Sequence, residues 1–193
     1  RGTQIGYYGQ IWRPPGRPAN RWHMNAHRQK QTQDQTRQQA TVRYPTVEIA
    51  KQALNFSIAH FTIFSATERE DLHGHNFQLA CKVTAPLAAD GLLFDYSLLK
   101  KLLRSLCDEI DEQVILPANS PHLTFTEDEH YTIAVFNGER IPFLPRDVTI
   151  LPIANTTVEE FSHYFLGKLR QHALIRDNGV VALSVKVSSS PGQ

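Results

Sequence analysis

A two-residue alternation of polar and apolar side chains begins after residue 47 and constrains the fold more than any other feature. In "ALNFSIAHFTIF", residues 53–64, the side chains of Phe56, Ile58 and His60 fall on one face. The alternation continues in "HNFQLACKVTA", residues 75–85. Because successive side chains of a strand point to opposite faces, both segments are predicted to be strands with one buried face.

Two further segments have helical periodicity. Residues 97–110 carry a leucine stripe after Ser97, a plausible N-cap, and residues 156–174 begin with Thr156 and Thr157, either of which can cap a helix. Between the two helices, "YTIAVFNGERIPF" contains an Asn-Gly pair, which is a strong hairpin signal. With a last alternating segment, "GVVALSVKVSSS", the order predicts an α+β domain whose antiparallel sheet has two helices on one face.

The first 44 residues differ from the rest in charge and pattern. They carry a net charge of +7, and the remainder carries −6. The acidic body gives no sign of a nucleic-acid groove. We expect residues 1–44 to be a disordered basic tail outside the fold, and residues 45–193 to form one domain. The single methionine, Met24, suggests that residues 1–23 are non-native.

Several classes of protein are disfavoured by simple counts. Cys81 and Cys107 are the only cysteines, too few for a disulfide framework, so a reducing compartment fits best. No apolar run approaches the roughly 18 residues of a membrane span, and no segment has the pattern of a signal peptide. We therefore expect a cytoplasmic protein without a membrane partner.

Three histidines form a candidate metal site. His73 and His75 flank Gly74, so on a strand both rings point the same way, and His60 of a neighbouring strand can complete the set. Three imidazoles with an open fourth position are typical of catalytic zinc. The alternative is three ordinary histidines in a β-rich core, but each ring would then need its own hydrogen-bond partner.

Five motifs in the same order resemble one known family. "FSIAHF", "LHGHNF", "GLLFDYSLLKKLL", "IDEQVILP" and "NTTVEEF" are similar to segments of the 6-pyruvoyl-tetrahydropterin and 6-carboxy-tetrahydropterin synthases. The likeness spans roughly residues 52–190. Each piece alone is common, and the combination is specific.

The resemblance implies a tunnelling fold whose subunits join their sheets into a barrel, as a homo-oligomer of hexamer or tetramer type with active sites between subunits. It also implies that His60, His73 and His75 bind Zn²⁺ and that a small-molecule pterin is the substrate. Thr157 and Glu159 match the segment of the family near the pterin. Asp95, in "LLFDY", matches a position of the family that has a structural role.

The chain departs from the family at the catalytic base. Relatives carry a cysteine four residues before the HGH, where this chain has Arg69. Arginine does not deprotonate in proteins, so it cannot be the base. Glu70 and Glu68 are the candidates, provided that burial raises the pKa of one of them. The alternative is that both belong to a solvated loop.

Two more family positions are altered. Asp111 matches the acid of the family's Asp-His relay, but Glu112 stands where the histidine is expected. Ser188 and Ser189 replace a Glu-Thr pair that binds the pterin edge in relatives, and Ser188 is the predicted substrate contact. The segment 121–150 is predicted to be a hairpin insertion. It either covers the active site or an edge of the oligomer, or it has no role in function.

Three functions remain open from the sequence. The first is a zinc-dependent lyase acting on 7,8-dihydroneopterin triphosphate or a close dihydropterin. The second is a zinc enzyme of the same fold with altered side-chain chemistry, of the epimerase or aldolase kind. The third is a non-catalytic subunit that binds a pterin or purine. The pathway is also open between folate-like, biopterin-like and queuosine-type biosynthesis.

Overall fold

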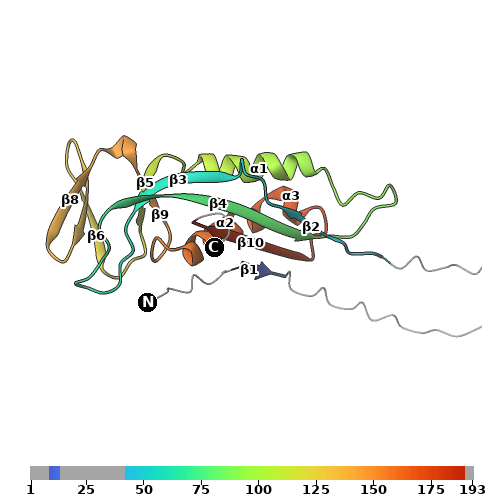
Figure 1. The fold of residues 1–193 in the computed structure, drawn as a ribbon, viewed down its shortest axis with the longest axis horizontal. Coiled ribbons are helices and arrows are strands. Elements are labelled where there is room, and N and C mark those ends of the chain that lie inside the picture. The colour runs from blue at the N-terminus through green and yellow to red at the C-terminus, as the bar shows by residue number, and fades with distance from the viewer. Residues whose placement is uncertain (1–8, 14–41, 190–193) are drawn as a thin grey trace, which may run out of the picture.

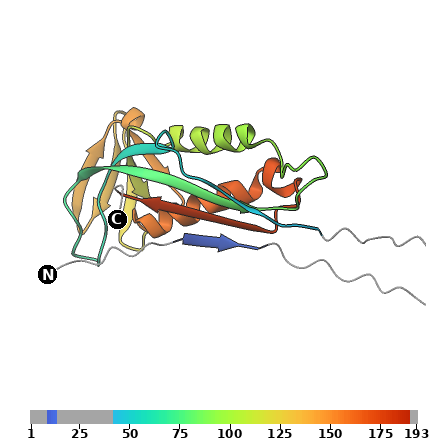
Figure 2. The ribbon, with the colours of Figure 1, turned by 45° about the vertical axis from the view of Figure 1, so that its right-hand side comes forward.

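The computed structural model describes residues 9–13 and 42–189 (Figure 1). A long curled sheet runs the length of the molecule, helices lie along it, and a small second sheet stands at one end (Figures 1 and 2). The elements in chain order are β1 (Gly9–Trp12), β2 (Thr46–Ile49), β3 (Asn55–His60), β4 (His73–Thr84), α1 (Tyr96–Asp108), β5 (Gln113–Pro117), β6 (Leu123–Glu127), β7 (Thr132–Phe136), β8 (Glu139–Phe143), a 3-10 turn (Pro145–Asp147), β9 (Val148–Leu151), α2 (Val158–Gln171), α3 (Ala173–Arg176) and β10 (Ala182–Ser188).

The main sheet is organised around β4, its longest strand. The strand order is β1-β10-β4-β3-β5-β9, and β2 also pairs with β4, beyond the end of β3. The pairs made by β4 are antiparallel, as the sequence predicts. Two edge pairs, β3–β5 and β5–β9, are parallel and were not predicted. The α+β class with an antiparallel-rich sheet is confirmed.

The N-terminal region contributes one strand to this sheet. The expectation that everything before residue 44 lies outside the fold is wrong for β1, which pairs antiparallel with β10 from Gly9 to Trp12. Trp12 packs against the edge of the core, and the guanidinium of Arg170 lies 5.6 Å from the centre of its ring. The rest of that prediction concerns residues 1–8 and 14–41, outside the described residues.

Both long helices begin at side-chain caps. Asp95, rather than the predicted Ser97, caps α1, because its carboxylate accepts a hydrogen bond from the Ser97 N–H at 2.8 Å. Thr157 caps α2 through the Glu160 N–H. The predicted leucine stripe of α1 holds, except that Leu98 is exposed. One side of each helix packs on the apolar face of β3, β4 and β10. The core between them includes Phe56, Phe77, Leu79, Leu99, Leu103, Phe161, Phe165 and Leu169.

The predicted hairpin insertion is a three-stranded sheet, β6-β7-β8. Asn137 and Gly138 form the turn between β7 and β8, with φ angles of 45° and 82°, which suit an Asn-Gly hairpin. The chain then returns to the main sheet as β9. A second apolar cluster joins this small sheet to the segment after β3 and includes Phe61, Ile63, Leu116, Leu123 and Phe136.

Within the described ranges, the first residues of β4 pair with a neighbouring strand on one side only. Along β4, β10 reaches only to Gln78, so residues 73–77 of β4 pair with β3 alone among the described residues. None of the helices in the described part of the chain is both long and apolar enough to cross a membrane.

Candidate metal centre and active site

The three predicted histidines meet at the free end of β4. His60 is the last residue of β3 and pairs directly with His73, the first residue of β4, while His75 lies opposite Ile58. The ring centres are 4.9 Å (His60–His73), 5.4 Å (His60–His75) and 4.8 Å (His73–His75) apart. One nitrogen from each ring lies within 4.8 Å of the others, so three nitrogen donors are gathered in one place. Strand alternation and register alone account for this convergence.

His60 is buried, and its polar atoms are not satisfied. The residue is 5% exposed, and neither ring nitrogen has a hydrogen-bond partner among the described residues. The Thr156 backbone contacts the ring, but outside hydrogen-bond geometry. Burial, followed by repulsion from His73 and His75, lowers the pKa of His60 to about 4. His60 is therefore a neutral imidazole at pH 7, with a lone pair available to a ligand.

The partners of His73 fix which of its nitrogens faces the cluster. The Nδ1 atom lies 2.7 Å from the Asp71 carbonyl oxygen, which can only accept, so Nδ1 carries the hydrogen. The Nε2 atom then keeps its lone pair. Metal-bound histidines commonly donate their other N–H in this way. With the unsatisfied nitrogens of His60, this arrangement fits a metal ion and satisfies buried polar atoms that have no other partner.

Glu70 is the acid that the fold brings to the histidines. Its Oε2 atom lies 4.0 Å from Nε2 of His73 and accepts a hydrogen bond from the Thr62 N–H at 2.9 Å. Burial acts to raise the pKa of Glu70, but the Thr62 hydrogen bond and the nearby histidines outweigh it and hold the pKa below its ordinary value. The direction is opposite to the one expected from burial. Glu70 is thus ionised at neutral pH and can accept a proton, but its lowered pKa makes it a weaker base than the raised pKa expected from the sequence would.

The two residues before Glu70 lie elsewhere. Glu68 is exposed, and the interaction it makes with the chain is through its backbone carbonyl, which accepts from the Phe64 and Ser65 N–H groups. Arg69 turns away from the histidines toward the small sheet. The structure therefore separates the two predicted acids and places only Glu70 at the cluster.

Asp111 and Glu112 do not line the pocket that holds all three histidines. The Asp111 carboxylate accepts from the Ser57 N–H at 2.7 Å and faces Arg104 at 3.5 Å. Glu112 has a φ of 58°, a left-handed conformation that is uncommon outside glycine. Glu112 lines a hollow of about 390 Å³ together with Asp147, and His75 lines the same hollow. The relay role predicted for Asp111 stays a prediction.

The residues predicted to bind the substrate divide between two faces. Thr157 and Glu159 line the histidine pocket, a cavity of about 200 Å³ that also holds Glu70. Ser188 does not line this pocket, whereas Ser189 does. Because Val187 points into the core, strand alternation turns Ser188 to the opposite face.

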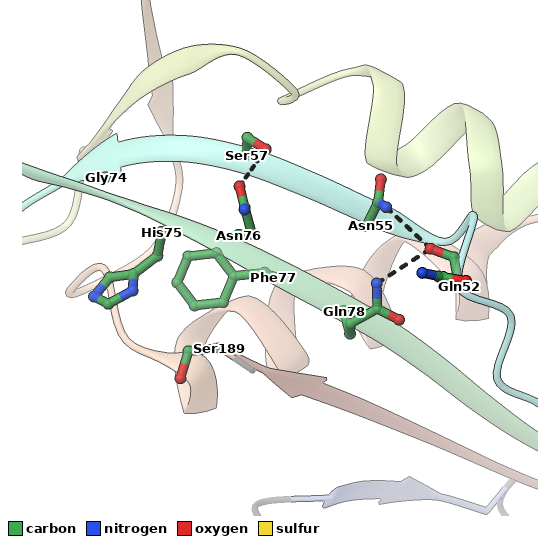
Figure 3. A pocket seen from close by; sticks show the side chains of 9 residues that line it. All are labelled: Gln52, Asn55, Ser57, Gly74, His75, Asn76, Phe77, Gln78 and Ser189. Carbon is green, nitrogen blue, oxygen red and sulfur yellow. Dashed lines mark hydrogen bonds between the residues drawn. The ribbon is translucent and has the colours of Figure 1, made fainter. Parts of the chain in front are cut away.

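A larger hollow adjoins the histidine pocket. It has a volume of about 840 Å³ and shares three lining residues with the pocket: His75, Phe77 and Ser189. Figure 3 shows His75 and Phe77 on one side of β4, while Asn76 points to Ser57, whose hydroxyl donates to it at 2.6 Å. The rest of the described lining is uncharged: three amide side chains, those of Gln52, Asn55 and Gln78, and Gly74.

Two residues before α2 tie the pocket together and were missed as site residues. Asn155 makes paired hydrogen bonds with the backbone of Ile63, accepting at 3.0 Å and donating at 2.8 Å. The Thr156 hydroxyl donates to the Phe61 carbonyl at 2.7 Å. These bonds fix the segment after His60 against the start of α2. In the sequence they are ordinary polar residues before a cap, without a distinguishing signal.

The two cysteines do not replace the family's thiol. Cys81 and Cys107 are both free and buried, and burial raises the pKa of each to about 12. Neither lines the histidine pocket. A thiolate base is therefore not available from the described part of this chain.

A similar architecture is found in solved pterin synthases. The chain aligns with 6-pyruvoyl tetrahydropterin synthase of Plasmodium falciparum at a TM-score of 0.72 and 29% identity, over 78% of this chain and 94% of the other. The Plasmodium vivax enzyme gives 0.73 and 28% over the same shares. Structures of the P. vivax enzyme also exist with its catalytic glutamate replaced by alanine or by cysteine. These likenesses place the chain in the tunnelling-fold class of α+β proteins.

Sequence comparison identifies the family. A profile described as 6-pyruvoyl tetrahydropterin synthase matches residues 48–193, most of the chain. The chain belongs to this family. A protein of Methanocaldococcus jannaschii named "Putative 6-carboxy-5,6,7,8-tetrahydropterin synthase" is 29% identical over 117 residues, which cover 60% of this chain and 71% of that protein. The resemblance on which the sequence analysis relied is confirmed, and with it a tetrahydropterin synthase-like lyase class.

Proposed function

We propose that this protein is a zinc-dependent lyase acting on 7,8-dihydroneopterin triphosphate or a close dihydropterin. The observation that carries the proposal is an ionised glutamate, Glu70, within 4.0 Å of a histidine whose free nitrogen faces two other imidazoles. A base beside an electrophilic centre is the arrangement that proton abstraction from a substrate side chain needs. A non-catalytic binding subunit would not require Glu70 to face the cluster.

His60, His73 and His75 would hold the zinc. Three imidazole donors leave one position open, which is the arrangement of catalytic rather than structural zinc sites. Zinc bound there supplies a Lewis acid that makes the hydroxyl and neighbouring C–H protons of a coordinated substrate easier to remove. The buried, unsatisfied nitrogens of His60 support this assignment over three independent histidines.

The other pocket residues have separate roles. Glu70 takes the proton, since its carboxylate is ionised at neutral pH and faces the histidines. Glu159, at the start of α2, lies in the same pocket and offers a carboxylate to the amino and ring N–H groups of a pterin. Thr157 and Ser189 add hydroxyls to the lining. The adjoining amide-lined hollow gives the rest of the substrate room without a charged contact in the described lining.

A second candidate is retro-aldol cleavage of the pterin side chain. The specific observation is that, in the described part of the chain, Glu70 is the acid within 4.0 Å of a histidine of the cluster, while the carboxylate of Asp111 faces Ser57 and Arg104. Retro-aldol cleavage needs a single base: it takes a side-chain hydroxyl proton as the adjacent C–C bond breaks, and can return a proton to the ring-side carbon. The catalytic residue of the P. vivax enzyme is also a glutamate, which supports a carboxylate in this role.

The assembly is proposed to be a homo-oligomeric barrel in the cytoplasm. The main sheet supports this proposal. Its two outermost strands, β1 and β9, each have one edge that pairs with no other strand in the described part of the chain. Sheet edges of this kind are available to pair with another copy.

The two candidates are separated by product analysis. Purified zinc-loaded protein is incubated with 7,8-dihydroneopterin triphosphate, and the products are identified by mass spectrometry. Release of inorganic triphosphate indicates the synthase reaction, and a shortened pterin side chain without that release indicates the retro-aldol reaction, because C–C cleavage leaves the triphosphate on the departing fragment. Pterin binding without any product would contradict both and favour a binding subunit.

A further inference from the structure

Arg69 places a cation within an apolar cluster. Its side chain is 20% exposed, and its guanidinium carbon lies 4.9 Å from the centre of the Phe61 ring and 5.7 Å from that of Phe136. One guanidinium nitrogen donates to the Glu70 carbonyl at 2.8 Å, and another faces the Glu139 carboxylate at 3.5 Å. A planar guanidinium can stack on aromatic rings and donate hydrogen bonds in its plane at the same time.

Arg69 and Glu70 occupy the return arm of a narrow loop between β3 and β4. The Glu70 N–H donates to the Thr62 carbonyl at 2.9 Å, and Ile63 forms an isolated antiparallel bridge with Arg69. In such an extended pair, adjacent side chains point to opposite sides. Glu70 therefore faces the histidines because Arg69 faces the small sheet.

The two arms of this loop are anchored by different parts of the molecule. The outgoing arm, residues 61–63, is held by Asn155 and Thr156 before α2. The return arm, residues 68–70, meets the small sheet through Arg69, whose partners Phe136 and Glu139 flank the β7–β8 turn. Figures 1 and 2 both show the loop beside that sheet. The insertion thus has a direct contact with the residue that precedes the base.

We propose that Arg69 is a positioning residue, which docks the base-carrying loop on the β6–β8 sheet and so holds the Glu70 carboxylate against the histidine cluster. The proposal rests on the proposed function of Glu70 and deepens it. It gives the insertion a role in the reaction, in place of a merely decorative one. It also gives a role to the arginine at the position where the resemblance predicts a thiol.

The effect of removing the guanidinium follows from these contacts. Methionine fills a similar apolar volume between the two rings but cannot donate to the Glu70 carbonyl. The return arm then keeps only its bonds to the outgoing arm. A displacement of about 1 Å in a catalytic group can lower the rate by about 100-fold.

The test compares wild type with Arg69→Met, Arg69→Lys and Glu139→Gln, with Arg140→Met as the matched control. Arg140 is an exposed arginine on the same hairpin, next to Glu139. For each protein, kcat and KM are measured for the pterin substrate, and amide hydrogen exchange is measured on peptides covering residues 61–72. Zinc content and the urea midpoint are recorded beside them.

We expect kcat of Arg69→Met to fall by about 10- to 100-fold with KM within about twofold, and exchange in residues 61–72 to rise. Arg69→Lys keeps the charge but not the planar stack, so it recovers part of kcat. Glu139→Gln removes a mostly exposed ion pair and changes kcat by about twofold at most. Arg140→Met behaves as wild type.

Two results would overturn the proposal: wild-type kcat in Arg69→Met, or unchanged exchange of residues 61–72 in that variant. If Arg69→Met does not fold, the test rests on Arg69→Lys. A kcat and an amide exchange of residues 61–72 equal to those of wild type in Arg69→Lys would then contradict a positioning role. An inactive wild type would contradict the proposed function instead, and the exchange measurement would still decide whether Arg69 orders the loop.

Discussion

Protonation of His60 is predicted to destabilise the metal-free protein as the pH falls. Burial, with repulsion from the other two histidines, lowers the pKa of His60 from 6.5 to about 4. The unfolded chain then binds the proton more readily than the folded chain, so stability is full above pH 6.5 and is lost as the pH falls toward 4. At 1.36 kcal/mol per pKa unit, the loss from this group is about 2 kcal/mol at pH 5 and about 3 kcal/mol at pH 4.

The assay is urea unfolding of EDTA-treated protein at several values of pH between 7.5 and 4.5. Carboxylates also titrate in this range, so the informative quantity is the difference between wild type and His60→Leu, which lacks the titrating ring. His163→Gln, which removes an exposed histidine from α2, is the control. We expect the difference between wild type and His60→Leu to change by about 2.5 kcal/mol between pH 7.5 and 4.5, and that for His163→Gln to stay flat. A flat difference for His60→Leu would refute the idea of a buried, neutral His60.

Three further substitutions test the site. Glu70→Gln is expected to lower kcat by about 10²- to 10⁴-fold while zinc content stays at the wild-type value, and wild-type turnover would exclude Glu70 as the base. Glu159→Gln is expected to raise KM for the pterin by about tenfold with little change in kcat, whereas an unchanged KM would place the pterin elsewhere. Asp111→Ala is expected to lower the free energy of unfolding by about 0.5–1.5 kcal/mol in urea, because it leaves the Ser57 N–H without its acceptor and removes one of the two carboxylates that face Arg104. A loss below about 0.5 kcal/mol would show that this carboxylate contributes little to the fold.

Much of the fold could be predicted because local periodicity and tertiary structure agree. The alternation in β3 and β4 placed His60, His73 and His75 on one face, and pairing of those strands did the rest. The Asn-Gly turn of the insertion was equally local, since both residues adopt positive φ angles there. Each of these features depends on neighbours in sequence or on a single strand pair.

What could not be predicted depends on contacts between distant segments. The pairing of β1 with β10 joins residues far apart in the chain, and the short segment Gly9–Trp12 has no periodic signal of its own. The orientation of Arg69 depends on Phe136, which comes from the insertion. The choice between Ser188 and Ser189 is a matter of one residue of register at the end of a strand, and a shift of one residue reverses which side chain faces the pocket.

The roles of Glu68 and Glu70 also depend on contacts between distant segments, so the sequence could not separate them. From the sequence, Glu68 and Glu70 are equivalent candidates flanking an arginine. The bridge between Ile63 and Arg69 and the hydrogen bonds between Thr62 and Glu70 fix the loop so that Glu70 alone faces the histidines. Those same hydrogen bonds lower the pKa of Glu70, against the expectation from burial.

The zinc content of purified protein tests the central claim most directly. Wild type, His73→Ala and the control His163→Ala are loaded with zinc, desalted and measured by inductively coupled plasma mass spectrometry. The three-histidine site predicts about one zinc per chain for wild type and for His163→Ala, and a value near zero for His73→Ala. Undiminished zinc in His73→Ala would contradict the three-histidine metal site.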